Sequence, residues 1–175
     1  MQSIESHIHE VISGLEDDQQ ALVTCLSGLK SSQDGQLKLS TGKSHDALPL
    51  LSEARTSFQK IPAARYMLAI TNADIAAAHA NLGNFSEAGS FANEAISTLQ
   101  GQATFAETEA NAHMTLANSL AMSGSHSEAD NHYDKAKELY QRLSNGSHYL
   151  RALEHNRAAA IGRISAGKKP WWKFW

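Results

Sequence analysis

The stretch that decides the fold reads Gly83-Asn84-Phe85-Ser86-Glu87-Ala88, followed by Ala92 and Ala95, and it recurs as Gly124-Ser125-His126-Ser127-Glu128-Ala129, followed by Tyr133 and Ala136. An earlier copy has Gly42, Ala47 and Ala54 at the same offsets. The glycines stand at 42, 83 and 124, a constant interval of 41 residues, and Gly167 follows after a similar step. In each copy we expect the glycine to end one helix, and alanines seven residues apart to line the next. Such self-similarity predicts stacked helical hairpins.

Composition indicates one domain without a membrane-spanning run. The 175 residues are 42% hydrophobic and carry a net charge of −3, which argues against a general nucleic-acid binder. The first six residues have neither a basic region nor an apolar core, so no secretory signal is expected. The single cysteine, Cys25, cannot form an internal disulfide and fits a reducing compartment. The expected location is the cytoplasm.

Helical spacing of apolar residues predicts an all-α protein of about eight helices. The expected segments are Ser3 to Gly14, a second helix carrying Leu22, Val23, Leu26 and Leu29 on one face, a third carrying Leu48, Leu51, Ala54 and Phe58, Pro62 to Leu82, Asn84 to Leu99, Phe105 to Met122, Ser125 to Leu143, and Tyr149 to Ala166. The last segment resembles the leading half of a fourth hairpin, and we expect it to cap the array.

Three local features qualify this reading. The polar stretch from Lys30 to Gly42 contains Gly35 and is expected to bend or fray. Pro49 is expected in the first turn of its helix, where its missing amide has no partner to lose. Asn84 with Glu87, and Ser125 with Glu128, have the spacing of capping boxes.

The glycine-turn-alanine pattern resembles the tetratricopeptide repeat, in which small residues let the two helices of a hairpin approach closely. An interval of 41 resembles the elongated repeats of the kinesin light chain type. The resemblance implies an antiparallel helical-hairpin array, a right-handed superhelix, over residues 1–167, followed by a short tail, 168–175. It also implies a concave groove lined by the leading helix of each hairpin.

This resemblance assigns a set of residues to a groove that binds a protein or peptide. The assigned positions are Asp74 and Asn81 in the second copy, Asn111, Met114, Asn118 and Met122 in the third, and Arg157 in the last helix. Asn118 falls where chaperone-binding members of the family place an asparagine for a peptide carboxylate, although the lysines and second asparagine of that clamp are not matched. Asparagines can pair with the amide and carbonyl of an extended peptide together. The alternative is that they are ordinary solvated helix positions.

No constellation of catalytic residues is apparent. The nine histidines lack a metal-binding spacing, and no His-Glu-x-x-His or paired-cysteine motif occurs. Surface or groove histidines are the simpler interpretation, and Cys25 is expected to be a small buried thiol rather than a nucleophile. We therefore expect neither enzyme activity nor a metal or cofactor.

The end of the sequence changes character abruptly. The segment 168–175 contains Lys168, Lys169, Trp171, Trp172, Lys173, Phe174 and Trp175. All three tryptophans of the sequence lie in this segment. Its aromatics could cover the final helix, lie at a membrane interface, or anchor in a pocket of a partner or a neighbouring copy. At about 25 cal/mol per Å² of buried apolar area, so short a segment supports reversible docking.

These observations lead to one main functional hypothesis and one alternative. The main hypothesis is a non-catalytic adaptor that binds a protein or peptide in its groove and makes a second contact, including self-association, through the tail. The alternative is a peripheral membrane protein held at the membrane surface by the aromatic and basic tail.

Overall fold

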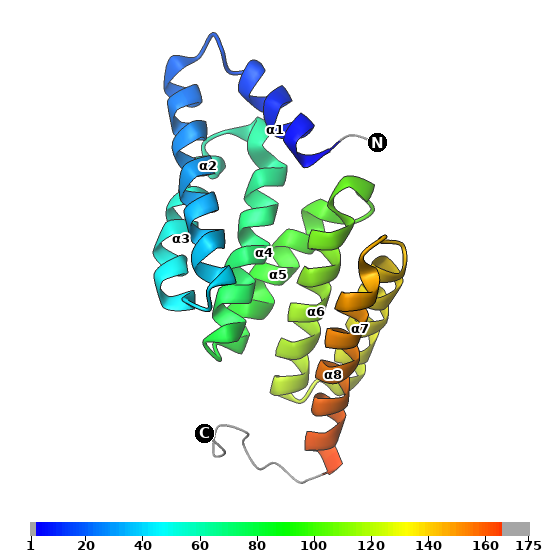
Figure 1. Ribbon diagram of the computed structural model, residues 1–175. Helices are drawn as coiled ribbons and strands as arrows, with labels where there is room; N and C mark the ends of the chain where they lie inside the picture. The colour runs from blue at the N-terminus through cyan, green and yellow to red at the C-terminus, as the bar shows by residue number, and fades with distance from the viewer. Residues whose placement is uncertain (1–2, 166–175) are drawn as a thin grey trace.

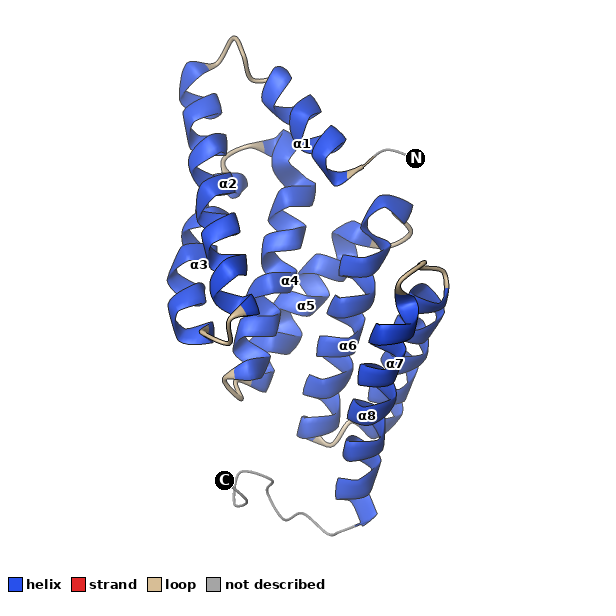
Figure 2. Cartoon of the chain, in the orientation of Figure 1, coloured by secondary structure: helices blue, strands red, loops and turns tan. Residues whose placement is uncertain are grey.

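The structure is a computed structural model and describes residues 3–165, which form only helices, turns and loops (Figures 1 and 2). The helices are α1 (Ile4–Ser13), α2 (Gln19–Ser40), α3 (Ser44–Gln59), α4 (Arg65–Asn81), α5 (Phe85–Leu99), α6 (Ala106–Ser123), α7 (His126–Gln141) and α8 (Gly146–Ser165). Short 3-10 turns, Pro62–Ala64 and Ala103–Phe105, precede α4 and α6. The predicted all-α class with about eight helices is confirmed for this part of the chain.

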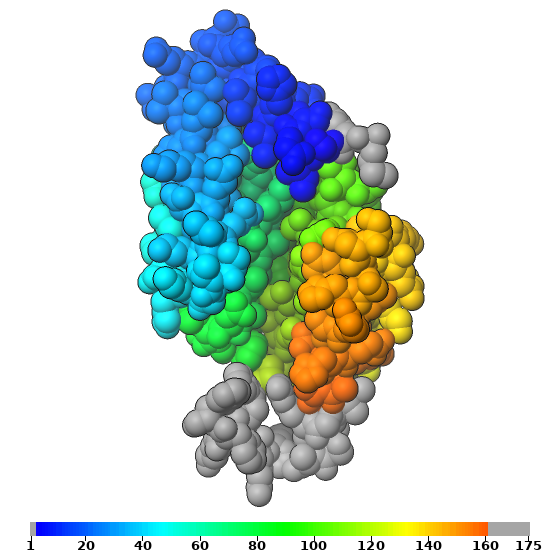
Figure 3. Space-filling model, in the orientation of Figure 1, coloured from blue at the N-terminus to red at the C-terminus, as the bar shows by residue number. Residues whose placement is uncertain are grey.

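The helices pack as successive hairpins. Helices α2 and α3, α4 and α5, and α6 and α7 are antiparallel partners, and the second helix of each pair also contacts the first helix of the next. The leading helices α2, α4, α6 and α8 additionally contact one another in that order. Figure 3 shows the surface hollowed between α2 and α8, with α4 and α6 forming the floor. The leading helices therefore line one face of the molecule.

The repeated residues have the structural roles that their spacing predicts. Gly42, Gly83 and Gly124 lie between helices with φ of 73°, 80° and 91°, a left-handed conformation that glycine adopts without a steric penalty. The paired alanines at 47 and 54, 88 and 95, and 129 and 136 are all at most 2% exposed. Because these side chains are small, the helices of each hairpin can approach closely.

A second set of small residues lies on the leading helices, where each packs against the second helix of its hairpin. Gly28, Ala69 and Ala110 share one register at intervals of 41, and Gly35, Ala76 and Ala117 share another. A Cβ on Gly35 would lie 2.7 Å from side-chain atoms of Leu51, and one on Gly28 would lie 2.9 Å from the ring of Phe58. The predicted bend between Lys30 and Gly42 is therefore wrong. Helix α2 runs continuously to Ser40, and Gly35 provides room for α3.

The apolar face expected on the second helix is only partly buried. Val23 is 56% exposed and Leu26 is 47% exposed, whereas the buried residues of α2 are Cys25 and several glycines and serines. At intervals of 41, Val23 and Leu26 correspond to Ala64 and Met67, which are buried beside α3. No helix of the described chain occupies the corresponding place beside α2, so these side chains remain exposed.

Two other local expectations are wrong. Pro49 lies inside α3, beyond its first turn, and is tolerated because its helix position is exposed, so the unpaired carbonyl of His45 can bond to water. Neither Asn84 nor Ser125 makes a side-chain capping hydrogen bond. The glycine before each cap already turns the chain, and the Asn84 amide bonds to the ring of His79 instead (3.3 Å).

No helix within residues 3–165 is both long and apolar enough to cross a membrane.

Candidate functional site

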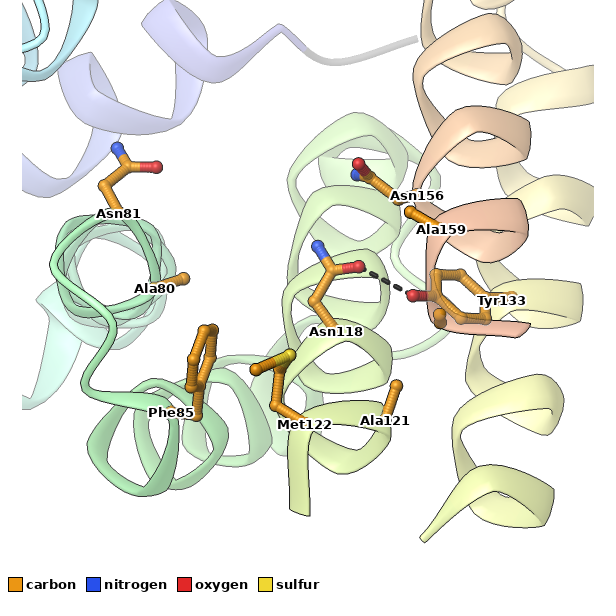
Figure 4. A pocket seen from close by; sticks show the side chains of 10 residues that line it. Ala80, Asn81, Phe85, Asn118, Ala121, Met122, Tyr133, Asn156 and Ala159 are labelled. Carbon is orange, nitrogen blue, oxygen red and sulfur yellow. Dashed lines mark hydrogen bonds between the residues drawn. The ribbon is translucent and has the colours of Figure 1, made fainter. Parts of the chain in front are cut away.

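A pocket opens between the leading helices α4, α6 and α8, near the ends of α4 and α6 (Figure 4). Its volume is about 280 Å³. The lining residues are Ala80, Asn81, Phe85, Asn118, Ala121, Met122, Tyr133, Asn156, Ala159 and Ala160. Alanines bring α4, α6 and α8 to the pocket with little side-chain bulk, so the space between them remains open.

The pocket has an apolar side. Phe85, the first residue of α5, faces Met122 of α6 across it, and the methyl groups of Ala80 and Ala121 extend this surface (Figure 4). The Gly83 turn brings α5 back beside α4, which places Phe85 at this position. A ring and a flexible thioether form an adaptable surface for another apolar or aromatic group.

Asn118 supplies an oriented hydrogen-bond donor. The buried Tyr133 hydroxyl donates to Asn118 Oδ1 at 2.7 Å, which fixes the amide plane and turns the Nδ2 group toward the open side (Figure 4). Within residues 3–165, Nδ2 of Asn118 has no hydrogen-bond partner. Asn118 can therefore donate to a ligand carbonyl without breaking an internal bond.

Asn81 and Asn156 have the complementary arrangement. Asn81 Nδ2 donates to the Ser44 hydroxyl at 3.2 Å, and Asn156 Nδ2 contacts the sulfur of Met114 at 3.8 Å. Their Oδ1 atoms have no hydrogen-bond partner in the described chain. The pocket thus offers one oriented donor and two acceptors, from three different helices.

The structure brings three of the seven predicted groove residues together here: Asn81, Asn118 and Met122 line the pocket. Asn111 and Met114 lie earlier in α6. Asn111 Oδ1 accepts a hydrogen bond from Tyr140 at 2.6 Å, and Met114 reaches the pocket only through its contact with Asn156. Asn111 therefore supports the packing of α6 on α7.

Asp74 lies two turns before Asn81 in α4, away from the pocket. Gln36 Nε2 of α2 donates to Asp74 Oδ2 at 2.8 Å, so the pair joins two leading helices. Burial raises the pKa of Asp74 to about 6, and the hydrogen bond from Gln36 opposes this shift. The carboxyl group therefore changes charge in mildly acidic solution.

Arg157 does not line the pocket. Its guanidinium bonds to Asp130 at 3.0 Å and to Asp134 at 2.6 Å, both on α7. The register at intervals of 41 explains this, because Ile75 and Leu116 occupy the equivalent positions and are 2% and 3% exposed. That position packs against the second helix of the preceding hairpin, and Arg157 makes the same contact through charge.

Phe85, Tyr133 and Asn156 belong to the site and were not assigned to it from the sequence. Asn156 could have been found by applying the interval of 41 strictly, because it follows Asp74 and Thr115 in that register. Tyr133 was identified only as a packing residue, and nothing in the sequence indicated that its hydroxyl reaches Asn118. Phe85 lay within the repeat but was given no functional role.

The most buried histidine forms a cluster outside the pocket. His113 Nδ1 and His132 Nδ1 are 2.9 Å apart, and Glu109 lies 3.9 Å from His113. Burial lowers the pKa of His113 to about 4 and also lowers the pKa of His132, so both rings are neutral at pH 7. Within residues 3–165, no three His, Cys, Asp or Glu side chains are placed to hold a metal ion. Cys25 is fully buried, as predicted.

The predicted tail residues Lys168, Lys169, Trp171, Trp172, Lys173, Phe174 and Trp175 lie outside the described residues. Comparisons with protein-family models, with curated proteins and with solved structures find no match. The case for function therefore comes from the geometry of the pocket and from the sequence.

Proposed function

We propose that the protein is a non-catalytic adaptor whose leading helices bind a segment of extended peptide between α4, α6 and α8. The supporting observation is the set of three asparagines, each with one end of its amide engaged by the protein and the other end unpaired within residues 3–165. A peptide backbone presents a carbonyl and an amide at each residue, so it matches a donor beside two acceptors. Phe85 and Met122 would contact an apolar side chain of that peptide.

The same proposal includes the architecture of a tetratricopeptide-like array of the elongated type, coiled as a right-handed superhelix. Its support is the glycine at each interhelical turn, the buried alanine pairs, and the contact of each hairpin with the next. Side chains on the leading helices of such an array face the groove. Its location in the cytoplasm is part of the proposal.

A second candidate is a peripheral membrane protein. The observation in its favour is the segment 168–175, which combines three tryptophans with three lysines, because such residues suit the headgroup region of a bilayer. The helical array would then present this segment. The two candidates differ in whether the asparagine pocket or the tail supplies the main contact.

A peptide-display selection against the purified full-length protein tests the adaptor proposal. Peptides enriched on the wild type are then measured on Asn118→Ala and Asn156→Ala, with Asn131→Ala, at an exposed position of α7, as the matched control. We expect each pocket variant to weaken binding by about three- to tenfold, because one hydrogen bond to the peptide is lost, and the control to leave it unchanged.

Thermal unfolding of each variant separates a local effect from loss of fold, which matters for Asn118 because its removal leaves the Tyr133 hydroxyl without this acceptor. Failure to enrich any peptide over an empty matrix, or equal affinities for all three variants, would rule the proposal out.

A further inference from the structure

We propose that the aromatic segment 168–175 binds the pocket between α4, α6 and α8 of the same chain. This inference rests on the proposed function, because it assigns a ligand to the same pocket. The ligand is an aromatic and basic peptide supplied in cis, which an external partner must displace.

The segment is within reach of the pocket. Helix α8 supplies Asn156, Ala159 and Ala160 to the lining and ends at Ser165. With a rise of about 1.5 Å per residue, Ala160 lies roughly 8 Å and Asn156 roughly 14 Å from the end of this helix. Six residue steps separate Ser165 from Trp171, and extended chain covers up to about 20 Å in that number of steps. A single reversal of the chain after α8 therefore suffices.

The pocket matches the size and chemistry of an aromatic side chain. Its volume of about 280 Å³ equals roughly nine waters at about 30 Å³ each, which suits one or two ring-sized groups rather than a folded element. Phe85 offers a ring face and Met122 offers a sulfur, and both interact favourably with aromatic rings. An indole also carries one N–H donor, which the unpaired Oδ1 atom of Asn81 or Asn156 can accept.

The charge of the segment matches the location of the pocket. Ala80 and Asn81 are the last two residues of α4, and Met122 precedes the last residue of α6, so the pocket lies at the C-terminal ends of both helices, with the N-terminal end of α5 also beside it at Phe85. The carbonyl ends of helices carry partial negative charge and attract cations. Helix α6 has no basic residue in its last turn, and α4 has only His79. Lys168, Lys169 and Lys173 supply the cations that these ends lack.

Intrinsic tryptophan fluorescence of the purified full-length protein tests this directly, because all three tryptophans lie in the segment. The measurements are the emission maximum and the quenching by acrylamide, with a synthetic peptide of residues 166–175 as the reference for a free segment. The pocket variant is Ala159→Lys, and Ala158→Lys, the exposed neighbouring position of the same helix, is its control. Met122→Lys and Ser123→Lys form a second matched pair in α6.

We expect the wild type and both control variants to emit at shorter wavelength than the peptide and to resist acrylamide. In Ala159→Lys and Met122→Lys, emission and quenching should shift to the values of the peptide while the helical circular dichroism stays unchanged. This assay contains no external partner, so its outcome is independent of whether the peptide selection succeeds.

Four results would overturn the proposal. Peptide-like fluorescence of the wild type would show a free segment, and equal behaviour of pocket and control variants would place the binding elsewhere. A blue shift that disappears on dilution would indicate the groove of a second copy. A blue shift that requires vesicles of phosphatidylcholine and phosphatidylserine would indicate the membrane interface instead.

Discussion

Leu51 of α3 occupies the space that Gly35 leaves on α2, and this contact shows how single residues set the distance between paired helices. Leu51 is fully buried, and a Cβ on Gly35 would approach it to 2.7 Å. In the next hairpin the corresponding residues are Ala76 and Ala92, both fully buried in one cluster. In that hairpin the second helix carries a smaller residue than Leu51, and the first helix carries a larger residue than Gly35.

We predict that Gly35→Ala destabilises the protein by about 1–3 kcal/mol, because the added methyl group overpacks the contact with Leu51. Leu51→Ala alone should cost about 2–5 kcal/mol through a cavity. The double variant recreates the Ala76 and Ala92 pair, so its cost should be smaller than the sum by about 1 kcal/mol or more.

Urea unfolding of the four proteins measures this coupling. Strict additivity of the two costs would show that the two residues do not share this space.

At this scale the sequence indicated the alanines and the interhelical glycines but not the role of Gly35 inside a helix. A glycine within a helical pattern indicates a less stable helix unless the residue that packs opposite it is known. The same limit applies to the pocket. Asn118 was predicted from the resemblance to a known repeat, whereas the bond from Tyr133 that orients its amide joins two helices and depends on their packing.

Helix α3 contains a proline, a residue unfavourable for helical conformation, in its interior. Pro49 lies inside the helix, where it donates no backbone hydrogen bond and its ring crowds the preceding turn. The helix persists because Leu51, Ala54 and Phe58 are almost fully buried against its neighbours. Tertiary packing thus outweighs the local preference, which is why the expected position of Pro49 in the first turn was wrong.

We predict that Pro49→Ala stabilises the protein by about 1–2 kcal/mol. The change restores the amide of residue 49 as a donor to the helix, and the greater freedom of the unfolded chain offsets part of the gain. Pro62→Ala is the matched control, because Pro62 begins a 3-10 turn and should bring no gain.

Thermal or urea unfolding of the two variants measures these changes in the free energy of unfolding. A destabilised Pro49→Ala protein would mean that proline is needed for the start of α3.

The existence and order of the helices were predictable because the apolar spacing is regular over long segments. The exposure of side chains along α2 was not predictable, because Val23 and Leu26 follow the same register as the buried Ala64, just before α4, and Met67, in α4. Whether a preceding hairpin covers that face cannot be read from the helix itself. The capping boxes failed because neither the Asn84 nor the Ser125 side chain bonds to the first amides of the helix that follows it.

For the molecule as a whole, buried ionisable groups link stability to pH in opposite directions. The pKa of His113 is lowered from 6.5 to about 4, so between these values the unfolded chain binds a proton that the folded chain does not. Its contribution to stability is present above pH 6.5 and is lost as the pH falls toward 4. The pKa of Asp74 is raised from 3.8 to about 6, so in that range the folded chain binds the extra proton and gains stability on acidification.

We predict that variants of His113 and Asp74 change the pH dependence of the free energy of unfolding in opposite directions between pH 7 and pH 5. Each pH unit corresponds to about 1.4 kcal/mol. His113→Gln should therefore lose about 2 kcal/mol less than the wild type on acidification, and Asp74→Asn should lose about 1 kcal/mol more.

The measurement is the free energy of unfolding in urea at both pH values, and only the difference between the two pH values is compared, so a constant cost of the substitution cancels. Identical pH dependence in all three proteins would contradict the burial of these groups.

At this scale the sequence predicted a sequential array, and the contacts between successive hairpins agree with that description. The pocket was less predictable, because it combines residues from α4, α5, α6, α7 and α8. Three of its members were predicted from the resemblance to a known repeat. The others depend on how far each hairpin is displaced from its neighbour, which the periodicity alone does not determine.

The facing small and large residues of the hairpins have a consequence for how this architecture can change. Gly35 meets Leu51, while Ala76 and Ala92 share one cluster and Ala117 and Tyr133 share another, so the same two positions are filled with different volumes in each hairpin. Exchanging such a pair would widen or narrow one hairpin and, because Leu51 shares a buried cluster with Ile75 of α4, would also shift the next hairpin. The width of the pocket can therefore be adjusted in small inherited steps, two codons at a time.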